Sequence, residues 1–309
     1  MSYAETILTE LRRAVIGKDD IILKTFLTMI AGGHLLLEDK PGVGKTTLAV
    51  SFSKVLQLNY KRMQFTPDVM PTDVTGFTVY NKERRTNEYQ PGAILCNLFL
   101  ADELNRASSR TQSALLEAME EGQVTVDGIT HPLPVPFMVI AAQNPYGSSG
   151  TQLLPDSQMD RFMMCLSIGY PSPENEIELL KRKQGQNPMD TLRKIADAAS
   201  IAAIQKNVAN IYASEDIFKY IVRLVAATRT HPDLRQGASP RASLALANMG
   251  RAVAWVQGRD YVIPADIQFI FTDTVAHRLL LTRQAEQDHK TARDICNSIL
   301  KKVAAPRIK

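Results

Sequence analysis

The chain has 309 residues with a net charge of +4, and 45% of the residues are hydrophobic and 22% charged. These values are those of a soluble globular protein with about two domains, and the charge is too small to indicate nucleic-acid binding by itself. Three isolated cysteines, Cys96, Cys165 and Cys296, argue against a disulfide or zinc framework and favour the reducing cytoplasm. The sequence shows neither a secretory signal nor an apolar run that could span a membrane, although docking onto a membrane partner stays open.

The N-terminal part is typical of two helices followed by a strand, a glycine-rich loop and a third helix. Apolar residues at helical spacing predict the first two helices over 5–15 and 21–30. An apolar strand over 34–38 runs into Asp39-Lys40-Pro41-Gly42-Val43-Gly44-Lys45-Thr46-Thr47, and a helix over 46–56 follows. This succession is how a phosphate-binding loop is built.

The glycine loop predicts a nucleoside triphosphate site. Gly42 and Gly44 allow consecutive backbone N–H groups to turn inward around phosphate oxygens. Lys45 can place a positive charge at the β- and γ-phosphates, and the Thr46 hydroxyl can reach Mg²⁺. The usual first glycine of such a loop is replaced by Asp39, which we attribute to the tolerance of aspartate for unusual backbone angles. The simpler alternative is a glycine turn that binds no nucleotide.

The remaining pattern separates a mixed part from a helical part. Strands are predicted over 59–65, 94–101, 137–142 and 162–168, a helix over 108–122, and hairpins over 76–91 and 122–137, the second around Asp127-Gly128. From residue 174 we expect helices only, over 174–183, 192–206, 214–230, 239–257, 264–281 and 291–303, with Trp255 and Phe269 in their core. The polar segment 184–188 marks the boundary between an α/β nucleotide-binding domain, 1–185, and a smaller all-α domain, 186–309.

Two predicted strands end in polar side chains. Asp102-Glu103 closes one apolar strand, and Asn144 follows the strand over 137–142. Ligands bind at the carboxyl ends of strands in open α/β sheets. Asp102 is therefore a candidate Mg²⁺ ligand, Glu103 a candidate general base for the attacking water, and Asn144 a candidate for orienting that water. The alternatives are a solvated acidic strand end and a simple Asn-Pro turn.

Two arginines are candidates for contact with the γ-phosphate. Arg161 lies just before the last predicted strand, and Arg241 follows Ser239-Pro240 at the first turn of a predicted helix. An arginine supplied to the γ-phosphate can raise the hydrolysis rate by about 10³–10⁵-fold. The alternative for each is an exposed ion pair at a helix end, worth about 0–1 kcal/mol.

The order of these motifs resembles the MoxR family of AAA+ ATPases over essentially the whole chain. The resemblance rests on the phosphate loop and on five further segments, which are 100–107 (LADELNRA), 112–121 (QSALLEAMEE), 143–145 (QNP), 160–162 (DRF) and 237–242 (GASPRA). It implies an α/β AAA+ P-loop domain with a central parallel five-stranded sheet, followed by a smaller all-α lid. It also implies that the hairpins at 76–91 and 122–137 are the helix-2 insert and the pre-sensor-1 hairpin, which usually point at the pore of a ring.

Matching motif positions assigns roles to individual residues, with ATP and Mg²⁺ as ligands. The residues matched for catalysis are Glu103, Asn144 (sensor 1), Arg161 (the arginine finger that acts on the neighbour's ATP) and Arg241 (sensor 2, acting in cis). Those matched for the nucleotide are Ile16, Gly17, Pro41, Gly42, Val43, Gly44, Lys45, Thr46, Thr47 and Arg241, with Ile16-Gly17 at the adenine. Those matched for the metal are Thr46 and Asp102.

The resemblance also implies partners. Family members form rings, usually of six subunits, and commonly act with von Willebrand factor A-domain proteins in assembly or maturation of other proteins; this sequence contains no such domain, so we expect a separate adaptor. The main hypothesis is a chaperone-like ATPase that remodels partner proteins. A nucleotide-gated binding module with slow turnover and a DNA-directed AAA+ protein are the alternatives, although we expect neither a nucleic-acid partner nor direct membrane insertion.

Overall fold

The computed structural model describes residues 2–144, 154–183 and 188–307, and the chain divides into two compact units. Unit 1 consists of Met1–Thr25, His34–Leu154 and Leu166–Ala202, and unit 2 of Phe26–Gly33, Pro155–Cys165 and Ala203–Lys309. The predicted domain ranges stay a prediction. The compact units differ from them because residues 26–33 and 155–165 belong to unit 2 and because unit 1 continues to residue 202. The residues after 187 pack on unit 1, since the N–H groups of Ile195 and Ala196 both donate to Val55 O, at 2.8 and 3.2 Å.

A five-stranded sheet forms the core of unit 1. Its order is β2 (Tyr60–Gln64), β5 (Leu98–Asp102), β8 (Met138–Gln143), β1 (Leu35–Glu38) and β9 (Met164–Leu166). The pairs β2–β5, β5–β8 and β8–β1 are parallel. Every residue of β5 and β8 is buried, as expected for central parallel strands that are covered on both faces. The carboxyl ends of β1, β5 and β8 therefore meet at one edge of the sheet.

Helices of unit 1 begin and end at capping residues. Ser2 caps α1 by accepting from Glu5 N (3.2 Å), Ser108 caps α5 by accepting from Thr111 N (3.3 Å), and α5 ends at Gly122, which has φ +64°. The helices are α1 (Tyr3–Ala14), α2 (Asp19–Ile30, which continues into unit 2), α3 (Lys45–Val55), α4 (Pro71–Thr75), the 3₁₀ turns η1 (Leu104–Arg106) and η2 (Pro188–Asp190), α5 (Ser109–Glu121) and α7 (Pro173–Lys183).

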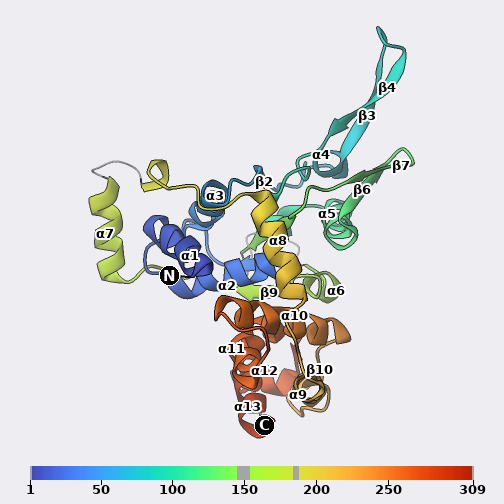
Figure 1. Ribbon diagram of the computed structural model, residues 1–309. Coiled ribbons are helices and arrows are strands. Elements are labelled where there is room, and N and C mark those ends of the chain that lie inside the picture. The colour runs from blue at the N-terminus through green and yellow to red at the C-terminus, as the bar shows by residue number, and fades with distance from the viewer. Residues whose placement is uncertain (1, 145–153, 184–187, 308–309) are drawn as a thin grey trace. The chain divides into compact units, whose positions relative to one another are not determined.

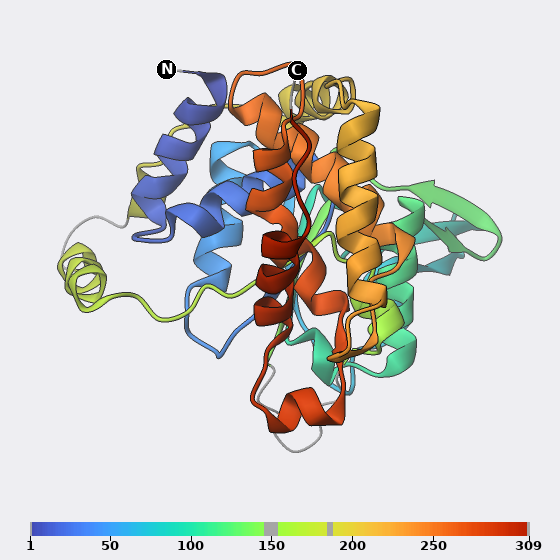
Figure 2. The same ribbon diagram turned by 90° about the horizontal axis from the view of Figure 1, so that it is seen from below.

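Two hairpins lie side by side and project from unit 1, as Figures 1 and 2 show. One pairs β3 (Gly76–Asn81) with β4 (Thr86–Pro91), and the other pairs β6 (Gln123–Val126) with β7 (Ile129–Pro132). The second turns at Asp127-Gly128, where both φ angles are positive, as the sequence predicts for a tight hairpin. The ring of Tyr89 stacks on that of His131 with centroids 3.7 Å apart, which joins the two hairpins.

Unit 2 is largely helical, but the expectation of helices only is wrong. A short antiparallel pair joins β10 (Leu234–Gln236) to β11 (Leu280–Leu281). The predicted helix over 264–281 therefore ends at 275, because the chain turns and pairs with β10. The helices are α6 (Asp156–Met159), α8 (Ala198–Ala209, which starts in unit 1), α9 (Glu215–Arg229), α10 (Pro240–Val256), α11 (Pro264–Val275), the 3₁₀ turn η3 (Ala276–Arg278), α12 (Arg283–Gln287) and α13 (Ala292–Lys302).

Two other expectations for the helical part need correction. The helix predicted over 192–206 begins at Ala198, where the Asp197 carboxylate accepts from Ser200 N (2.8 Å) at the first turn, and residues 192–197 have no regular secondary structure. Phe269 is not a core residue, since 42% of it is exposed, and Trp255 is half-buried. None of the described helices has the length and apolar character that crossing a membrane requires.

Candidate nucleotide-binding site

The glycine loop connects β1 to α3. Gly42 and Gly44 have φ angles of +88° and +102°, and a Cβ at either position would meet no neighbouring atom. The backbone conformation, and not crowding, therefore requires glycine here. Gly44 is the N-cap of α3 and supplies no side-chain cap, so the first N–H groups of the helix face the loop as donors for an anion. Pro41 and Thr47 are exposed, and Val43 and Thr46 are half-buried.

Lys45 places a buried positive charge beside this loop. Its exposed fraction is 8%, and its ammonium group donates to the main-chain oxygen of Asp39 (3.0 Å). Within the described ranges it has no carboxylate at ion-pair distance. Since a buried charge without a counter-charge is costly, the site fits a ligand that supplies negative charge, such as a phosphate.

The Asp39 carboxylate accepts three hydrogen bonds beside the loop. The prediction that aspartate stands here because it tolerates unusual backbone angles is wrong. Asp39 does not have a positive φ. Instead its buried carboxylate accepts from the N–H groups of Ile168 (2.6 Å) and Gly169 (3.0 Å) and from the Ser167 hydroxyl (2.9 Å). An aspartate stands where a glycine is usual because its side chain ties the segment after β9 to the start of the phosphate loop.

Asp102 ends β5, which β8 separates from β1 and its glycine loop in the sheet, so both lie at the same edge. Its carboxyl oxygen Oδ2 accepts from Arg62 Nη2 (2.8 Å), and the side chain is 12% exposed. No cluster of three or more His, Cys, Asp or Glu that could hold a metal occurs among the described residues. Mg²⁺, however, needs only one or two protein oxygen ligands beside phosphate and water. The Asp102 carboxylate and the Thr46 hydroxyl are ligands of the right chemistry for it.

Glu103 follows in a strained conformation with φ +55°, in the left-handed region that costs a residue other than glycine about 1–2 kcal/mol. A hydrogen bond from Arg106 (2.7 Å) is the main cause that holds the pKa of its carboxyl below the usual value, against the opposing effect of burial. A hydrogen bond from Gln64 and the charge of Lys45 lower the pKa further. Glu103 is therefore ionised near neutral pH and lies within the electrostatic reach of Lys45.

Asn144 follows β8, which lies between β1 and β5 in the sheet, and is half-buried. Its main-chain oxygen accepts from Asn105 Nδ2 (3.2 Å), so the end of β8 is tied to η1, the turn that follows the acidic pair. The predicted Gln143-Asn144-Pro145 motif continues at Pro145 outside the described residues. The structure thus brings Lys45, the acidic pair and Asn144 to the same edge of the sheet.

The Ile16-Gly17 segment lies between α1 and α2. Ile16 is half-buried, Gly17 has φ +65°, and a Cβ at Gly17 would overlap the side chain of Asn175. The next residue, Lys18, donates to the main-chain oxygens of Ile168 (2.6 Å) and Tyr170 (2.9 Å). The segment proposed for the adenine is therefore joined through Lys18 to Ile168 and Tyr170, on either side of Gly169, and the Asp39 carboxylate holds Ile168 and Gly169.

The two predicted arginines lie in unit 2. Arg161 follows α6 and is half-buried, and Arg241 is an exposed residue in the first turn of α10. All other predicted site residues lie in unit 1. The contacts of Arg161 and Arg241 with ATP stay predictions.

Comparisons with known proteins decide the family. A model of the ATPase family associated with various cellular activities (AAA) matches residues 34–164, and a model of the AAA lid domain matches residues 226–299. Chaperone MoxR1 of Mycobacterium tuberculosis is 38% identical over 98% of this chain and 82% of its own length. The chain belongs to the MoxR family of AAA+ ATPases.

Further matches agree with this assignment. An uncharacterized protein of Bacillus subtilis, YeaC, is 44% identical to the MoxR-family chain over 96% of this chain and 92% of its own length. A crystal structure of a protein from Cytophaga hutchinsonii that is provisionally named an ATPase superposes with a TM-score of 0.92 at 36% identity, over 99% of this chain and 95% of that one. The α/β AAA+ fold with a helical lid is thereby confirmed, and nucleotide binding follows from the fold.

Three residues outside the predicted site, Arg62, Gln64 and Arg106, contact the acidic pair of this MoxR-family chain. Arg62 and Gln64 lie on β2 and reach Asp102 and Glu103 because β2 pairs with β5 in a register that sets Gln64 beside Asp102. Nothing in the local sequence of β2 indicates that register. Arg106, in contrast, lies three residues after Glu103, a spacing at which a partner could have been expected.

Replacing Asp39 by glycine restores the usual first residue of a phosphate loop, yet we expect it to destabilise the MoxR-family chain. One buried N–H group, one partly buried N–H group and one hydroxyl lose a charged acceptor, which should lower the free energy of unfolding by about 2–3 kcal/mol. Urea denaturation measures the effect, and Asp68→Gly, in an exposed turn of unit 1, is the matched control. Equal stability of the Asp39 variant and the control would contradict the assigned role.

Proposed function

We propose that this chain hydrolyses ATP with Mg²⁺ in an oligomeric ring of six subunits and uses the energy to remodel or mature partner proteins. The observation that supports the proposal above all is that Lys45 and Glu103 lie at the same edge of the sheet. Lys45 follows the glycine loop after β1, Glu103 follows β5, and the charge of Lys45 lowers the pKa of Glu103. A phosphate-binding cation beside an ionised carboxylate is the arrangement that attack of water on a γ-phosphate needs.

In this proposal the residues of unit 1 divide the chemistry among them. Lys45 and the α3 N-terminus bind the phosphates, and Thr46 and Asp102 hold Mg²⁺, which when bound neutralises charge on the phosphate oxygens. Glu103 accepts a proton from the attacking water, and Asn144 orients that water. Because Arg106 keeps Glu103 ionised, the carboxylate is ready to accept the proton at neutral pH.

The residues of unit 2 make the reaction depend on assembly. Arg161 acts on the ATP of the neighbouring subunit, and Arg241 acts on the ATP of its own subunit, so loss of the γ-phosphate changes both contacts. Ile16 and Gly17 border the adenine. The site is then complete only where two subunits meet.

We infer that the partner is a protein reached through a separate von Willebrand factor A-domain adaptor, in the cytoplasm or at a membrane where that adaptor resides. The relative in M. tuberculosis carries the name of a chaperone, which supports a protein substrate. The two joined hairpins of unit 1, β3–β4 and β6–β7, offer exposed apolar side chains, including Phe77, Tyr80 and Ile129, as contacts for such a substrate.

The test is ATP hydrolysis per subunit over a wide range of protein concentration. Specific activity should fall as the ring dilutes apart, because each site then loses the neighbour's Arg161. Native mass at the lowest concentration distinguishes a very tight ring from a subunit that is complete alone. A monomer with full activity would contradict the proposal, and ATP binding without hydrolysis or assembly would favour a nucleotide-gated module.

A further inference from the structure

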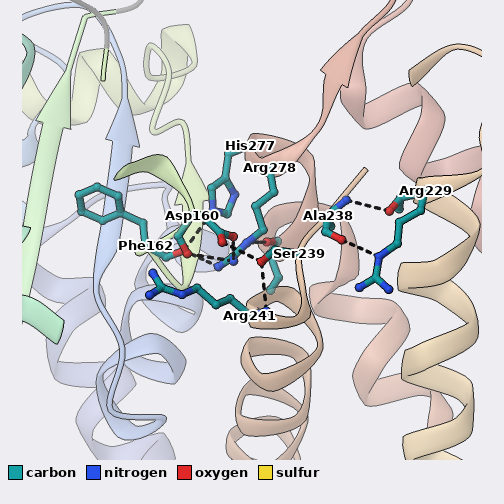
Figure 3. Close-up of polar contacts among 10 residues, drawn as sticks. Asp160, Phe162, Arg229, Ala238, Ser239, Arg241, His277 and Arg278 are labelled. Atoms are coloured by element: carbon teal, nitrogen blue, oxygen red, sulfur yellow. Dashed lines mark hydrogen bonds and ion pairs between the residues drawn. The ribbon is translucent and has the colours of Figure 1, made fainter. Parts of the chain in front are cut away.

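Asp160, the residue before the proposed arginine finger, holds two other parts of unit 2 through its carboxylate (Figure 3). Oδ1 forms an ion pair with Arg278 Nη1 at 2.5 Å, and Oδ2 accepts from the Ser239 hydroxyl at 2.7 Å. The Arg278 side chain is 3% exposed and that of Asp160 18%. The carboxylate is thus a largely buried junction between α6, η3 and the start of α10.

The same junction reaches Arg241 through the cap of its helix. Ser239 is the N-cap of α10, and its Oγ accepts from the N–H of Arg241 at 3.1 Å while donating to Asp160. The residue before it, Ala238, is fixed from the other side by α9, since its oxygen accepts from Arg229 Nε (2.9 Å) and its N–H donates to Thr228 Oγ1 (3.0 Å). The first turn of α10 therefore has a set position relative to Asp160.

The residue after the proposed finger is held as firmly as the one before it. The main-chain oxygen of Phe162 accepts from Arg278 Nη2 (2.6 Å) and lies 3.1 Å from His277 Nε2. Burial lowers the pKa of His277 to about 3, so the neutral imidazole donates this hydrogen bond. Phe162 itself is fully buried. Arg278 thus binds both Asp160 and Phe162, the residues directly before and after Arg161.

Arg278 also responds to the charge of Arg241. Burial is the main cause that lowers the pKa of Arg278, the carboxylate of Asp160 opposes it, and the positive charge of Arg241 lowers it further. Arg278 stays charged, as guanidinium groups do in proteins. The positive charges of Arg241 and Arg278 therefore oppose each other, and the Asp160 carboxylate compensates that of Arg278 through its ion pair.

We propose that Asp160, with Arg278 and Ser239, is a positioning junction that couples Arg241 to Arg161, so that the nucleotide state sensed in one subunit sets the finger that it presents to the next. This proposal rests on the proposed function, because it needs Arg161 to act in trans and Arg241 to act in cis. Its physical basis is the continuous chain of contacts from the Arg241 N–H through Ser239 and Asp160 to Arg278, and from Arg278 to both sides of Arg161. Small displacements of a group at reacting atoms can change rates by about 10²-fold.

Rings that contain two kinds of subunit can test the junction in the donor alone, which is the subunit that supplies Arg161 to its neighbour's site. A Glu103→Gln subunit should have a disabled site but an intact finger, and an Arg161→Ala subunit has an intact site but no finger. Mixing them should restore hydrolysis at sites where an Arg161→Ala subunit borders a Glu103→Gln neighbour. Asp160→Asn is then added to the Glu103→Gln subunit, which can influence the measured rate only through what it presents to its neighbour.

We expect Asp160→Asn in the donor to lower the restored rate by about 10- to 100-fold. Asp156→Asn, at an exposed position of the same short helix α6, is the matched control and should leave the restored rate unchanged. Nucleotide binding and native mass of each donor show that it folds and enters the ring. A restored rate that Asp160→Asn leaves unchanged would overturn the coupling proposal alone. Failure of the unmodified mixture to restore any activity would overturn the trans action of Arg161, and the coupling proposal with it.

A second variant decides the matter if the Asp160→Asn donor does not assemble. Ser239→Ala cuts the link to α10 and keeps the ion pair of Asp160 with Arg278. Its control is Ser214→Ala, which removes the equivalent cap of α9, where Ser214 Oγ accepts from Ile217 N (3.3 Å), without touching Asp160. We expect a loss of about threefold or more from Ser239→Ala donors beyond that from Ser214→Ala donors. Equal rates for these two donors would contradict the proposal.

Discussion

Replacing Glu103 by glutamine is expected to lower ATP hydrolysis by about 10²–10⁴-fold and to leave ATP binding nearly intact. Glutamine has the same shape and the same backbone cost at φ +55°, and its side-chain oxygen can still accept from Arg106. It cannot accept a proton from water. Because the glycine loop and Lys45 do not change, the loss should appear in kcat rather than in the affinity for ATP.

Phosphate release under saturating ATP measures kcat, and binding of a fluorescent ATP analogue measures affinity. Glu117→Gln, on the exposed face of α5 in the same unit, is the matched control and should keep the wild-type rate. A Glu103→Gln protein that turns over at more than a tenth of the wild-type rate would show that Glu103 is not the general base. A parallel loss of binding would show that Glu103 supports the loop instead.

The parts of the site that the sequence could predict are those that depend on residues consecutive in the chain. The strand, glycine loop and helix at 34–56 depend on local backbone preferences, and the structure has them in that order. The acidic pair is located by the apolar run before it, since a buried strand that ends in Asp102-Glu103 brings both to the edge of the sheet. The hairpin at Asp127-Gly128 likewise follows from residues that favour positive φ.

The parts that could not be predicted depend on pairs of residues far apart in the sequence. Asp39 meets residues 167–169 because β9 follows β1 in the sheet order, and local sequence explains neither the pairing nor the buried carboxylate. Asp160 and Arg278 are 118 positions apart, and each alone resembles an ordinary surface charge. The β10–β11 pair is too short, at three and two residues, to leave an alternating pattern. Tertiary contacts decided these features against local preference.

Loss of the Arg161 guanidinium is expected to lower the hydrolysis rate more than Glu103→Gln does, by about 10³–10⁵-fold, with little change in ATP affinity. In the proposed ring this group meets the charge that develops on the γ-phosphate of the neighbour's ATP, and ATP in the ground state does not need it for binding. Arg161→Ala removes it while Asp160 and Phe162 continue to hold the backbone on both sides. Arg161→Lys should recover only part of the rate, because an ammonium group lacks the planar fork of donors that fits a phosphate.

The decisive measurement for Arg161 is the dependence of specific activity on protein concentration. Wild-type activity should fall on dilution because the finger comes from another subunit. The residual activity of Arg161→Ala should be independent of dilution, since no contribution from a neighbour remains to be lost. Arg235→Ala, at an exposed position of β10 in the same unit, is the matched control and should behave as the wild type. If Arg161→Ala lost binding and hydrolysis equally, Arg161 would have a structural role; if its residual activity still fell on dilution, another group would be acting between subunits.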